Sequence, residues 1–366
     1  MKIGLLHLSD IHIKVDDNIV LNRSCKIPVA IQDYIFEIDK LFIVISGDSA
    51  YSGKQEEYYL AMQLINDIQE TIENIKKSLS IEFILIPGNH DCDFDKSTVR
   101  NIVLDSVKQG KPDISEEIIE TLTSVQTEYF EYLRAYESED KILDQKLLKI
   151  YKFSLGEYDI LFNCFNSAWL STINEQAGTL IFPIQMYEKL LQANKADLTV
   201  SLIHHPYNWY DPDNSREINR VLRQNSDIIL TGHEHVSTIN ILDDLQGNIT
   251  QHIEGSVLQE TWNDSISGFN FIFLDLSEKK QSITKYSWNG EYYKIENQIE
   301  NVDFIRSNLL QKNIFNLSDE FYRNLNDPGI PLKHPRNPNV KLKDIYIYTQ
   351  MQRNLKWMNA LVSKKK

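Results

Sequence analysis

Three short apolar runs near the start of this chain constrain its fold more than any other feature. They are Ile3 to Leu8, Leu41 to Ile45 and Phe83 to Ile86, and each gives way to polar residues. Runs of this kind are typical of strands buried within a sheet. Between the second and third runs, Glu56 to Leu79 carries apolar residues at helical spacing. The order strand, helix, strand predicts an α/β sheet, in which ligands bind beyond the carboxyl ends of the strands.

The remainder of the chain predicts a helical insertion, further strands and a C-terminal extension. Residues 96–146 are polar and helix-prone, so we assign them to a helical insertion or cap. After His235 the pattern is strand-like, which predicts a second, β-rich layer. The length of 366 residues fits one large domain over residues 1–300, followed by an extension over residues 301–366. Further strands are expected at 147–153, 158–165, 198–203, 227–230, 236–242, 249–253, 269–274, 283–288 and 292–295, and a helix at 183–193.

Charge and composition exclude several classes of protein. A net charge of −14 argues against a general basic surface for nucleic acid, although it leaves room for a local positive groove. The three cysteines are too few and too scattered for a disulfide framework or a paired-cysteine zinc site. The N-terminus lacks the pattern of a signal peptide, and no apolar run reaches the length of a membrane span. We therefore expect a cytoplasmic protein with no membrane partner.

Side chains that bind metals follow directly after five of the expected strands. Asp10 and His12 are two residues apart at a strand end, so both can point to one face, and His233 and His235 repeat this spacing. Carboxylate, imidazole and amide donors together suit Mn²⁺, Fe²⁺ or Zn²⁺ better than Ca²⁺. A glycine precedes three of the motifs, where a missing Cβ lets the backbone approach an ion. The five segments are Ser9-Asp10-Ile11-His12, Gly47-Asp48, Gly88-Asn89-His90-Asp91, His204-His205-Pro206 and Gly232-His233-Glu234-His235.

In this order, the motifs DxH, GD, GNHD, H and GHxH resemble those of the calcineurin-like metallophosphoesterase family, from residue 3 to about residue 240. That family includes nuclease subunits, cyclic-nucleotide phosphodiesterases and phosphoprotein phosphatases. The resemblance implies a four-layer α/β/β/α sandwich with two divalent metal ions, Mn²⁺ being expected first and Fe²⁺ or Zn²⁺ as alternatives. It also implies the ligands, which are Asp10, His12 and His235 on one ion, Asn89, His204 and His233 on the other, and Asp48 as the bridge.

The resemblance further implies a mechanism, in which the ions clamp the phosphate and a hydroxide that bridges them attacks phosphorus in line. His90 matches the family position that protonates the leaving oxygen or stabilises its charge. Relatives that cleave phosphomonoesters often carry an acidic residue that orients this histidine, and Tyr51 occupies that position here. Either His90 lacks a carboxylate partner, or Asp91 or Asp93 replaces it. The departure favours a phosphodiesterase.

Several residues beside these motifs have competing interpretations. His205 follows a ligand directly and either supports the metal site from behind or faces solvent. Tyr207, Trp209 and Tyr210 could stack on a nucleobase, although aromatic residues near a loop more often pack within the protein. The candidate substrate contacts are His205, Tyr207, Trp209 and Tyr51. Structural roles without metal ligation are expected for Cys92, His7, His252 and His334.

The sequence thus predicts a metal-dependent hydrolase that acts on a phosphodiester in a nucleotide or nucleic acid. Within the enzyme class, the alternatives are a nuclease, a nucleotide or cyclic-nucleotide phosphodiesterase, and a phosphomonoesterase. A different class is an effector or docking subunit of a larger nuclease or defence assembly. In that case the C-terminal extension, with its run Val340 to Met351, would bind a protein partner or a second copy. The complete ligand set argues against a catalytically inactive module.

Overall fold

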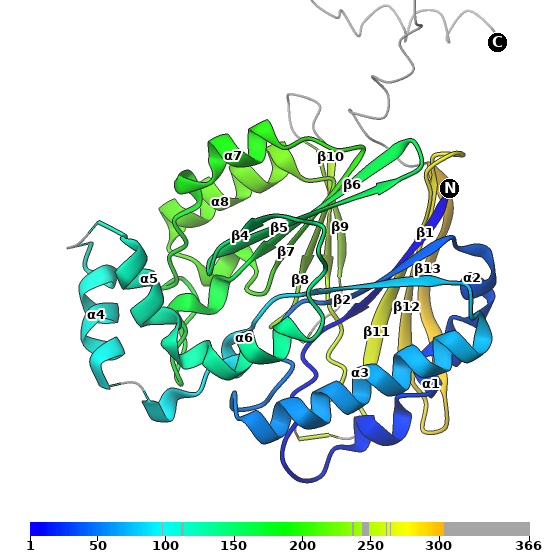
Figure 1. The fold of residues 1–366 in the computed structure, drawn as a ribbon, viewed down its shortest axis with the longest axis horizontal. Helices are drawn as coiled ribbons and strands as arrows, with labels where there is room; N and C mark the ends of the chain where they lie inside the picture. Colours follow the sequence, from blue (N-terminus) through cyan, green and yellow to red (C-terminus); the bar gives the residue numbers. More distant parts are fainter. Residues whose placement is uncertain are drawn as a thin grey trace, which may run out of the picture. The chain divides into compact units, whose positions relative to one another are not determined.

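Two β-sheets pack face to face, and helices cover both outer surfaces (Figure 1). This arrangement confirms the predicted four-layer α/β/β/α sandwich. The structure is a computed structural model and describes residues 1–96, 98–110, 113–235, 238–243, 249–260, 262–263 and 265–303. No helix in this part of the chain is long and apolar enough to cross a membrane.

One sheet has six strands, three from the start of the domain's sequence and three from its end. In spatial order these are β13 (Tyr293–Asp303), β12 (Lys280–Trp288), β11 (Gly268–Asp275), β1 (Lys2–Leu8), β2 (Lys40–Ile45) and β3 (Ser80–Leu85). β1 and β2 pair in parallel, with Leu5 opposite Phe42. β11 pairs with β1 in the antiparallel direction, with Phe271 opposite Leu6. The central strands are apolar on both faces because both faces of the sheet are covered.

The other sheet has seven strands, which come from the middle of the sequence. In spatial order they are β4 (Lys141–Asp144), β5 (Leu148–Leu155), β6 (Tyr158–Phe165), β7 (Leu198–Ile203), β8 (Ile228–Thr231), β10 (Ile249–Glu254) and β9 (Ile239–Asp243). β6, β7, β8 and β10 are parallel to one another. Their carboxyl ends therefore meet at one edge of the sheet, which is where ligands bind in such sheets.

Apolar side chains fill the space between the sheets and beneath the helices. Between the sheets, Leu5 and Phe42 belong to the same buried cluster as Phe162 and Val200. The outer face of the six-stranded sheet is covered by α1 (Lys26–Ala30), α2 (Gln32–Glu37), α3 (Gln55–Ile75) and α6 (Thr127–Arg134). The outer face of the seven-stranded sheet is covered by α4 (Thr98–Lys108), α5 (Glu116–Leu122), α7 (Glu188–Ala193) and α8 (Pro212–Asn225).

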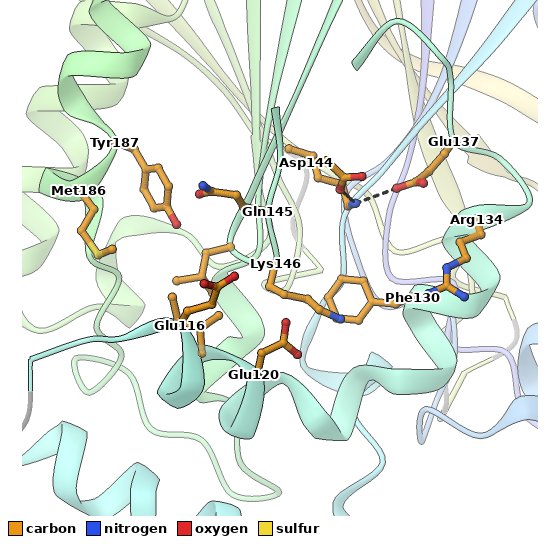
Figure 2. A pocket seen from close by; sticks show the side chains of 13 residues that line it. Glu116, Glu120, Phe130, Arg134, Glu137, Asp144, Gln145, Lys146, Met186 and Tyr187 are labelled. Atoms are coloured by element: carbon orange, nitrogen blue, oxygen red, sulfur yellow. Dashed lines mark hydrogen bonds and ion pairs between the residues drawn. The ribbon is translucent and has the colours of Figure 1, made fainter. Parts of the chain in front are cut away.

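The stretch assigned to a helical insertion contains α4, α5 and α6 but ends in a strand. β4 pairs with β5 at the edge of the seven-stranded sheet, and its charged residues conceal it in the sequence. A cavity of about 440 Å³ lies between the insertion helices and this edge (Figure 2). Its wall includes Lys149, which forms an ion pair with Glu137 at 2.7 Å. None of the predicted metal ligands lines this cavity.

Two expectations about secondary structure need correction, and one helix was missed. The strands after His235 do not form a layer of their own, because β9 and β10 extend the seven-stranded sheet while β11 to β13 extend the six-stranded one. The helix expected at 183–193 is divided into a 3-10 turn, Ile184–Met186, and α7. α8 was not expected, although Asp211 caps its N-terminus with a side-chain oxygen and Pro212 starts it.

The predicted C-terminal extension, residues 301–366, is described only in its first three residues, which end β13. The run Val340 to Met351 and His334 lie outside the described residues. A docking role for the extension therefore stays a prediction.

Candidate metal centre

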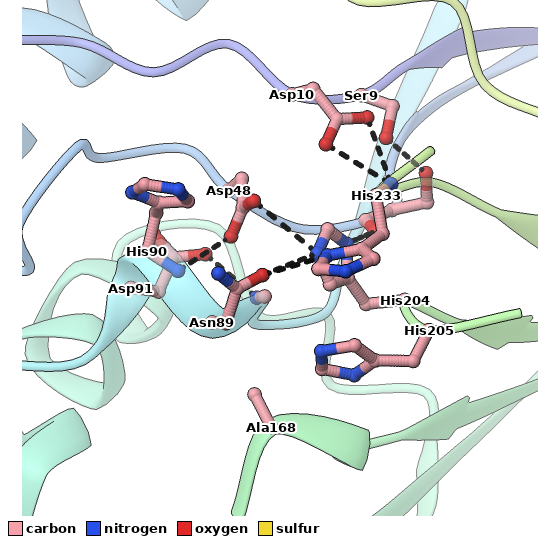
Figure 3. A network of polar contacts seen from close by, with 12 residues as sticks. Ser9, Asp10, Asp48, Asn89, His90, Asp91, Ala168, His204, His205 and His233 are labelled. Carbon is pink, nitrogen blue, oxygen red and sulfur yellow. Dashed lines mark hydrogen bonds and ion pairs between the residues drawn. The ribbon is translucent and has the colours of Figure 1, made fainter. Parts of the chain in front are cut away.

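The carboxyl ends of five strands from both sheets deliver polar loops to one place (Figure 3). β1 and β2 are followed by Asp10 and Asp48, and β3 by Asn89. From the other sheet, β7 is followed by His204 and β8 by His233. Because the two sheets face each other, their loops meet above the shared core. The structure thus brings the predicted ligands together from segments that are far apart in sequence.

One set of ligands, here called the Asp10 group, consists of Asp10, His12 and His235. One ligand atom from each lies within 4.8 Å of the others. His235 Nε2 is 3.6 Å from Asp10 Oδ1, and Asp10 also accepts the backbone N–H of His233 at 3.0 Å. Asp10 and His12 are buried, whereas 31% of the His235 side chain is exposed.

The second set, here called the Asn89 group, consists of Asn89, His204 and His233. Asn89 Oδ1 lies 3.1 Å from His204 Nε2 and 2.9 Å from His233 Nδ1. The edge of the Trp209 indole packs against the His233 ring, with 4.0 Å between ring centroids. These contacts hold an amide oxygen and two ring nitrogens around one point.

Asp48 lies between the two groups. Its Oδ2 is 3.4 Å from His12 Nε2 and 3.3 Å from His204 Nε2, so one oxygen faces both groups. Its Oδ1 accepts the backbone N–H of His90 at 2.8 Å. This is the position that a bridging carboxylate requires.

The backbone is strained at the ligands themselves. Asp10, His12 and Asp48 have φ values of 51°, 51° and 58°, and His233 and His235 have 75° and 57°. Residues other than glycine seldom adopt this left-handed conformation, which costs about 1–3 kcal/mol each. Since the strain gathers at the predicted ligands, the rest of the fold must offset it to hold these side chains in place.

Glycine makes the close approach of the loops feasible. A Cβ on Gly88 would lie 2.1 Å from Asp48 Oδ1, and one on Gly47 would lie 2.3 Å from His204 Nδ1. Real Cβ atoms do not come this close to other atoms. Any larger residue at either position would therefore displace a predicted ligand.

The donors fit divalent metal ions. The ring nitrogens that face away from the centre are held by neighbours: His12 Nδ1 by the Gln259 carbonyl at 3.3 Å, and His204 Nδ1 by the Ser46 carbonyl at 2.8 Å. Such outer hydrogen bonds are typical of metal-binding histidines, because they leave the other nitrogen for the ion. His12 Nε2 points inward and is buried, and among the described residues it has only the 3.4 Å approach of Asp48 Oδ2 and no hydrogen bond. A buried nitrogen without a partner is what a metal ion would satisfy.

Charge interactions set the protonation of the centre. Burial alone would raise the pKa of Asp48, but His204 and the other histidines hold that pKa well below its usual range. Burial would lower the pKa of His204, and Asp48 instead raises it to about 10. Burial, together with His205 and His204, lowers the pKa of His233. Asp48 is therefore anionic and His233 neutral, the forms in which each binds a metal ion, whereas His204 would have to release the proton that Asp48 stabilises before it could bind one.

His90 has a partner that the sequence did not predict. Its Nδ1–H is donated to the backbone carbonyl of Tyr51 at 2.7 Å, and the Tyr51 ring stacks on it. Neither proposed carboxylate replaces the missing acidic residue. Asp91 accepts hydrogen bonds from the backbone of Ser49, Ala50 and Gly88, and Asp93 pairs with Lys54 at 2.7 Å. Both aspartates are occupied by the loops that they stabilise.

The aromatic residues after His205 pack within the protein. Tyr210 is 2% exposed and belongs to the core of the seven-stranded sheet, which contradicts a stacking role for it. The Tyr207 hydroxyl is buried as well. Trp209 packs on His233 and donates its indole N–H to Glu234 at 2.6 Å. Of the candidate substrate contacts, Tyr51 is the most open, with 39% of its surface exposed.

His205 is buried and does not face solvent. Its Nδ1 is 2.8 Å from Ser167 Oγ and its Nε2 is 3.1 Å from Glu175 Oε2, while its ring lies 4.6 Å from that of His233. Glu260 plays a similar part for the other group, with Oε2 2.8 Å from His235 Nδ1. Sequence analysis missed both glutamates, because no motif links them to the histidines that they hold. Cys92, His7 and His252 are buried, as expected of structural residues.

A bacterial protein is similar in sequence to most of this chain. A metallophosphoesterase-like protein of Bacillus subtilis strain 168, YydB, is 23% identical over 309 residues, which are 80% of this chain and 61% of YydB. The chain therefore spans less than two thirds of that relative.

Solved structures resemble the chain only remotely. A hypothetical protein from Thermus thermophilus has a TM-score of 0.36 at 13% identity, and covers 82% of this chain and 100% of its own. Vps29 from Entamoeba histolytica in complex with zinc has a TM-score of 0.32 at 12% identity, and covers 82% and 99%. Similarity at this level assigns no activity.

The sequence profile of the calcineurin-like phosphoesterases matches residues 3–237, a range that includes every residue of the Asp10 group, the Asn89 group and Asp48. The family carries out metal-dependent hydrolysis of phosphate esters. The chain belongs to the calcineurin-like phosphoesterase family.

Proposed function

We propose that the protein hydrolyses a phosphodiester in a nucleotide or nucleic acid. The observation that carries this proposal is the partner of His90, which is the neutral carbonyl of Tyr51 instead of a carboxylate. A carboxylate would stabilise the protonated form of the ring, and a ring that is held protonated would suit the dianion of a phosphomonoester. Without it, the site favours the single charge of a diester.

The carboxylates around the metal centre support the same choice. Glu175 and Glu260 lie against His205 and His235, and each is only 5% exposed, so water screens their charge weakly. Negative charge in this position opposes a dianion more than a monoanion. The difference disfavours a terminal phosphate relative to an internal one.

The chain's own residues do defined work in the reaction. Two bound divalent ions, with Mn²⁺ expected ahead of Fe²⁺ or Zn²⁺, would supply Lewis acidity and an activated water. Asp48 presents one oxygen to both ligand groups and so sets their separation. His90 donates its Nδ1–H to Tyr51, which fixes the ring with Nε2 free, and in its doubly protonated form the ring would give the Nε2 proton to the leaving oxygen.

The net charge of the chain limits which nucleic acids it could bind as substrates. A net charge of −14 repels long duplexes, whose binding depends on neutralising many phosphates. Nucleotides and short single strands carry fewer charges and are repelled less. We therefore expect these, in place of long duplexes, among the substrates.

A hydrolysis panel with added Mn²⁺ tests the proposal. The substrates are bis-p-nitrophenyl phosphate, p-nitrophenyl phosphate, 2′,3′- and 3′,5′-cyclic nucleotides, and single- and double-stranded oligonucleotides. We expect kcat/KM for bis-p-nitrophenyl phosphate to exceed that for p-nitrophenyl phosphate by about tenfold or more. Chelator-treated protein serves as the control and should be inactive. A preference for the monoester would overturn the proposal.

A further inference from the structure

We propose that a cavity beside His235 binds a second phosphate of the substrate, one nucleoside away from the phosphate that is cleaved. The inference rests on the proposed function and names the substrate more closely, as a nucleotide strand or a nucleoside with two phosphates. The cavity has a volume of about 550 Å³, within the range of sites that hold a nucleotide. His235, a predicted metal ligand, forms part of its wall.

The cavity reaches the candidate metal centre at His235. The His235 ring lies 5.1 Å from the His12 ring, which in turn lies 4.8 Å from the His90 ring. A ligand in the cavity would thus lie next to His235, at the edge of the centre. This edge belongs to the Asp10 group.

Strands β11, β12 and β13 supply the opposite wall. Ser287 lies opposite Gly268 on one side and opposite Lys294 on the other, and Lys285 projects to the same face two residues earlier. The wall therefore presents two ammonium groups and a hydroxyl from neighbouring strands. A rigid sheet holds them in fixed order.

The charge of this wall is positive in an otherwise acidic protein. Lys285 pairs with Glu296 at 3.2 Å, so these two charges largely offset each other. Lys294 is exposed and has no carboxylate partner among the described residues. One uncompensated ammonium group remains at the cavity, and it would attract an anion.

Ser256 gives a second, independent sign of a ligand. Its side chain is 5% exposed and lines the cavity, and its Oγ has no hydrogen-bond partner in the part of the chain that the structure describes. Gly268 makes room for it, because a Cβ there would lie 3.1 Å from Ser256 Cβ. A buried hydroxyl without a partner is costly unless a ligand or water completes it. Lys294 would donate to a phosphate oxygen directly, whereas the Ser256 oxygen, which is closed off from solvent here, would have to rotate toward the cavity to donate to the same ligand.

Inhibition of bis-p-nitrophenyl phosphate hydrolysis by nucleotides measures how strongly this subsite binds a second phosphate. The inhibitors are thymidine 5′-monophosphate, thymidine 3′-monophosphate, thymidine 3′,5′-bisphosphate and thymidine 5′-diphosphate. We expect the bisphosphate to inhibit the wild-type protein about tenfold better than either monophosphate. Lys294→Ala should bring that ratio close to one, and Lys294→Arg should restore it. Ser256→Ala should reduce it partly.

Lys189→Ala removes an exposed lysine from α7, on the outer face of the other sheet, and should leave both the ratio and turnover unchanged. Equal inhibition by the bisphosphate and the monophosphates, or an unchanged ratio in Lys294→Ala, would overturn the subsite. If only the 5′-diphosphate inhibits more strongly, the second phosphate is adjacent to the first and the spacing proposed here is wrong.

The two proposals can fail separately. If bis-p-nitrophenyl phosphate is not hydrolysed, the proposed function fails, and calorimetric titration of the same nucleotides in the presence of Mn²⁺ still compares bisphosphate with monophosphate. If the diester is hydrolysed and the ratio is one, only the subsite fails.

Discussion

The two ligand groups of the metal centre are supported in different ways. In the Asn89 group, His204 is fully buried and bonds to a backbone carbonyl, that of Ser46. The Trp209 ring fixes His233 in the same group. In the Asp10 group, His12 is likewise held by a backbone carbonyl, that of Gln259, but His235 is partly exposed and bonds to a side chain, the Glu260 carboxylate. The cavity of about 550 Å³ opens beside it.

The difference suggests a division of roles, in which the Asn89 group would hold its metal ion and the Asp10 group would face the incoming substrate. Backbone carbonyls and packed rings cannot easily move, so the Asn89 group is built to keep its ion. A side-chain carboxylate at a cavity wall is more adjustable and more open to solvent. We infer that the substrate enters on the side of the Asp10 group, and that the ion there exchanges more readily.

The largest effect is expected at Asp48, which joins the two groups. Asp48→Asn replaces the oxygen that faces both His12 and His204 by a neutral amide, so it should weaken both ions. Turnover should fall below detection, because the site would lose the ions that supply its Lewis acidity and activated water. Metal analysis after gel filtration, alongside turnover, makes the measurement. Normal content of both ions with normal activity would remove Asp48 from the bridge.

A smaller loss is expected for His90, which serves the leaving group and belongs to neither ligand group. His90→Gln should keep both ions and slow hydrolysis by about 10²–10⁴-fold. The loss should be greater with a nucleoside alkoxide as leaving group than with p-nitrophenolate, which departs readily without a proton. Equal losses on the two substrates would assign His90 to phosphate positioning instead.

The next prediction compares the two groups directly. Glu260→Gln removes the carboxylate that orients His235 and should weaken one ion by about 10- to 100-fold. Glu175→Gln is the matched change on the other side, where the carboxylate reaches His233 only through His205. It should leave both ions in place. Calorimetric titration with Mn²⁺ distinguishes the two variants. Equal losses of metal affinity in both would contradict the proposed difference between the groups.

The ligands were predictable because each belongs to a short motif at a strand end. Asp10 and His12, for example, follow directly on the apolar run that forms β1. Their supports were not predictable in this way. Glu175 is 30 residues from His205, and Gln259 is 247 residues from the His12 ring that its carbonyl holds. Such pairs come together only in the folded protein, so no local pattern in the sequence predicts them.

The fold shows the same limit. Alternating apolar residues identified β11 and β12 as strands, but alternation does not say which strand is the neighbour. β11 lies beside β1 because its apolar faces match the two cores on either side of that sheet. β4 escaped prediction because an edge strand needs few apolar residues and this one alternates between half-buried and exposed positions.

The smallest expected effect concerns His7, which lies beneath the Asn89 group. Its Nε2 is 2.8 Å from Ser46 Oγ, and the carbonyl of the same serine holds His204. His7 is fully buried, and burial lowers its pKa from 6.5 to about 3. Below pH 6.5 the unfolded chain therefore binds a proton on His7, whereas the folded protein does not bind it until the pH approaches 3. The contribution of His7 to the free energy of unfolding is therefore complete above pH 6.5 and falls as the pH drops toward 3.

The slope of this loss approaches about 1.4 kcal/mol per pH unit. His7→Gln keeps a polar group near Ser46 and cannot titrate, so its free energy of unfolding should fall less steeply between pH 6 and pH 4. Urea unfolding of wild type and variant in the same buffers gives the two slopes, and the other titrating groups cancel in the difference. Parallel slopes would mean that His7 is protonated in the folded protein. The layer beneath the Asn89 group would then be more open than its burial indicates, and the contrast between the two groups would weaken with it.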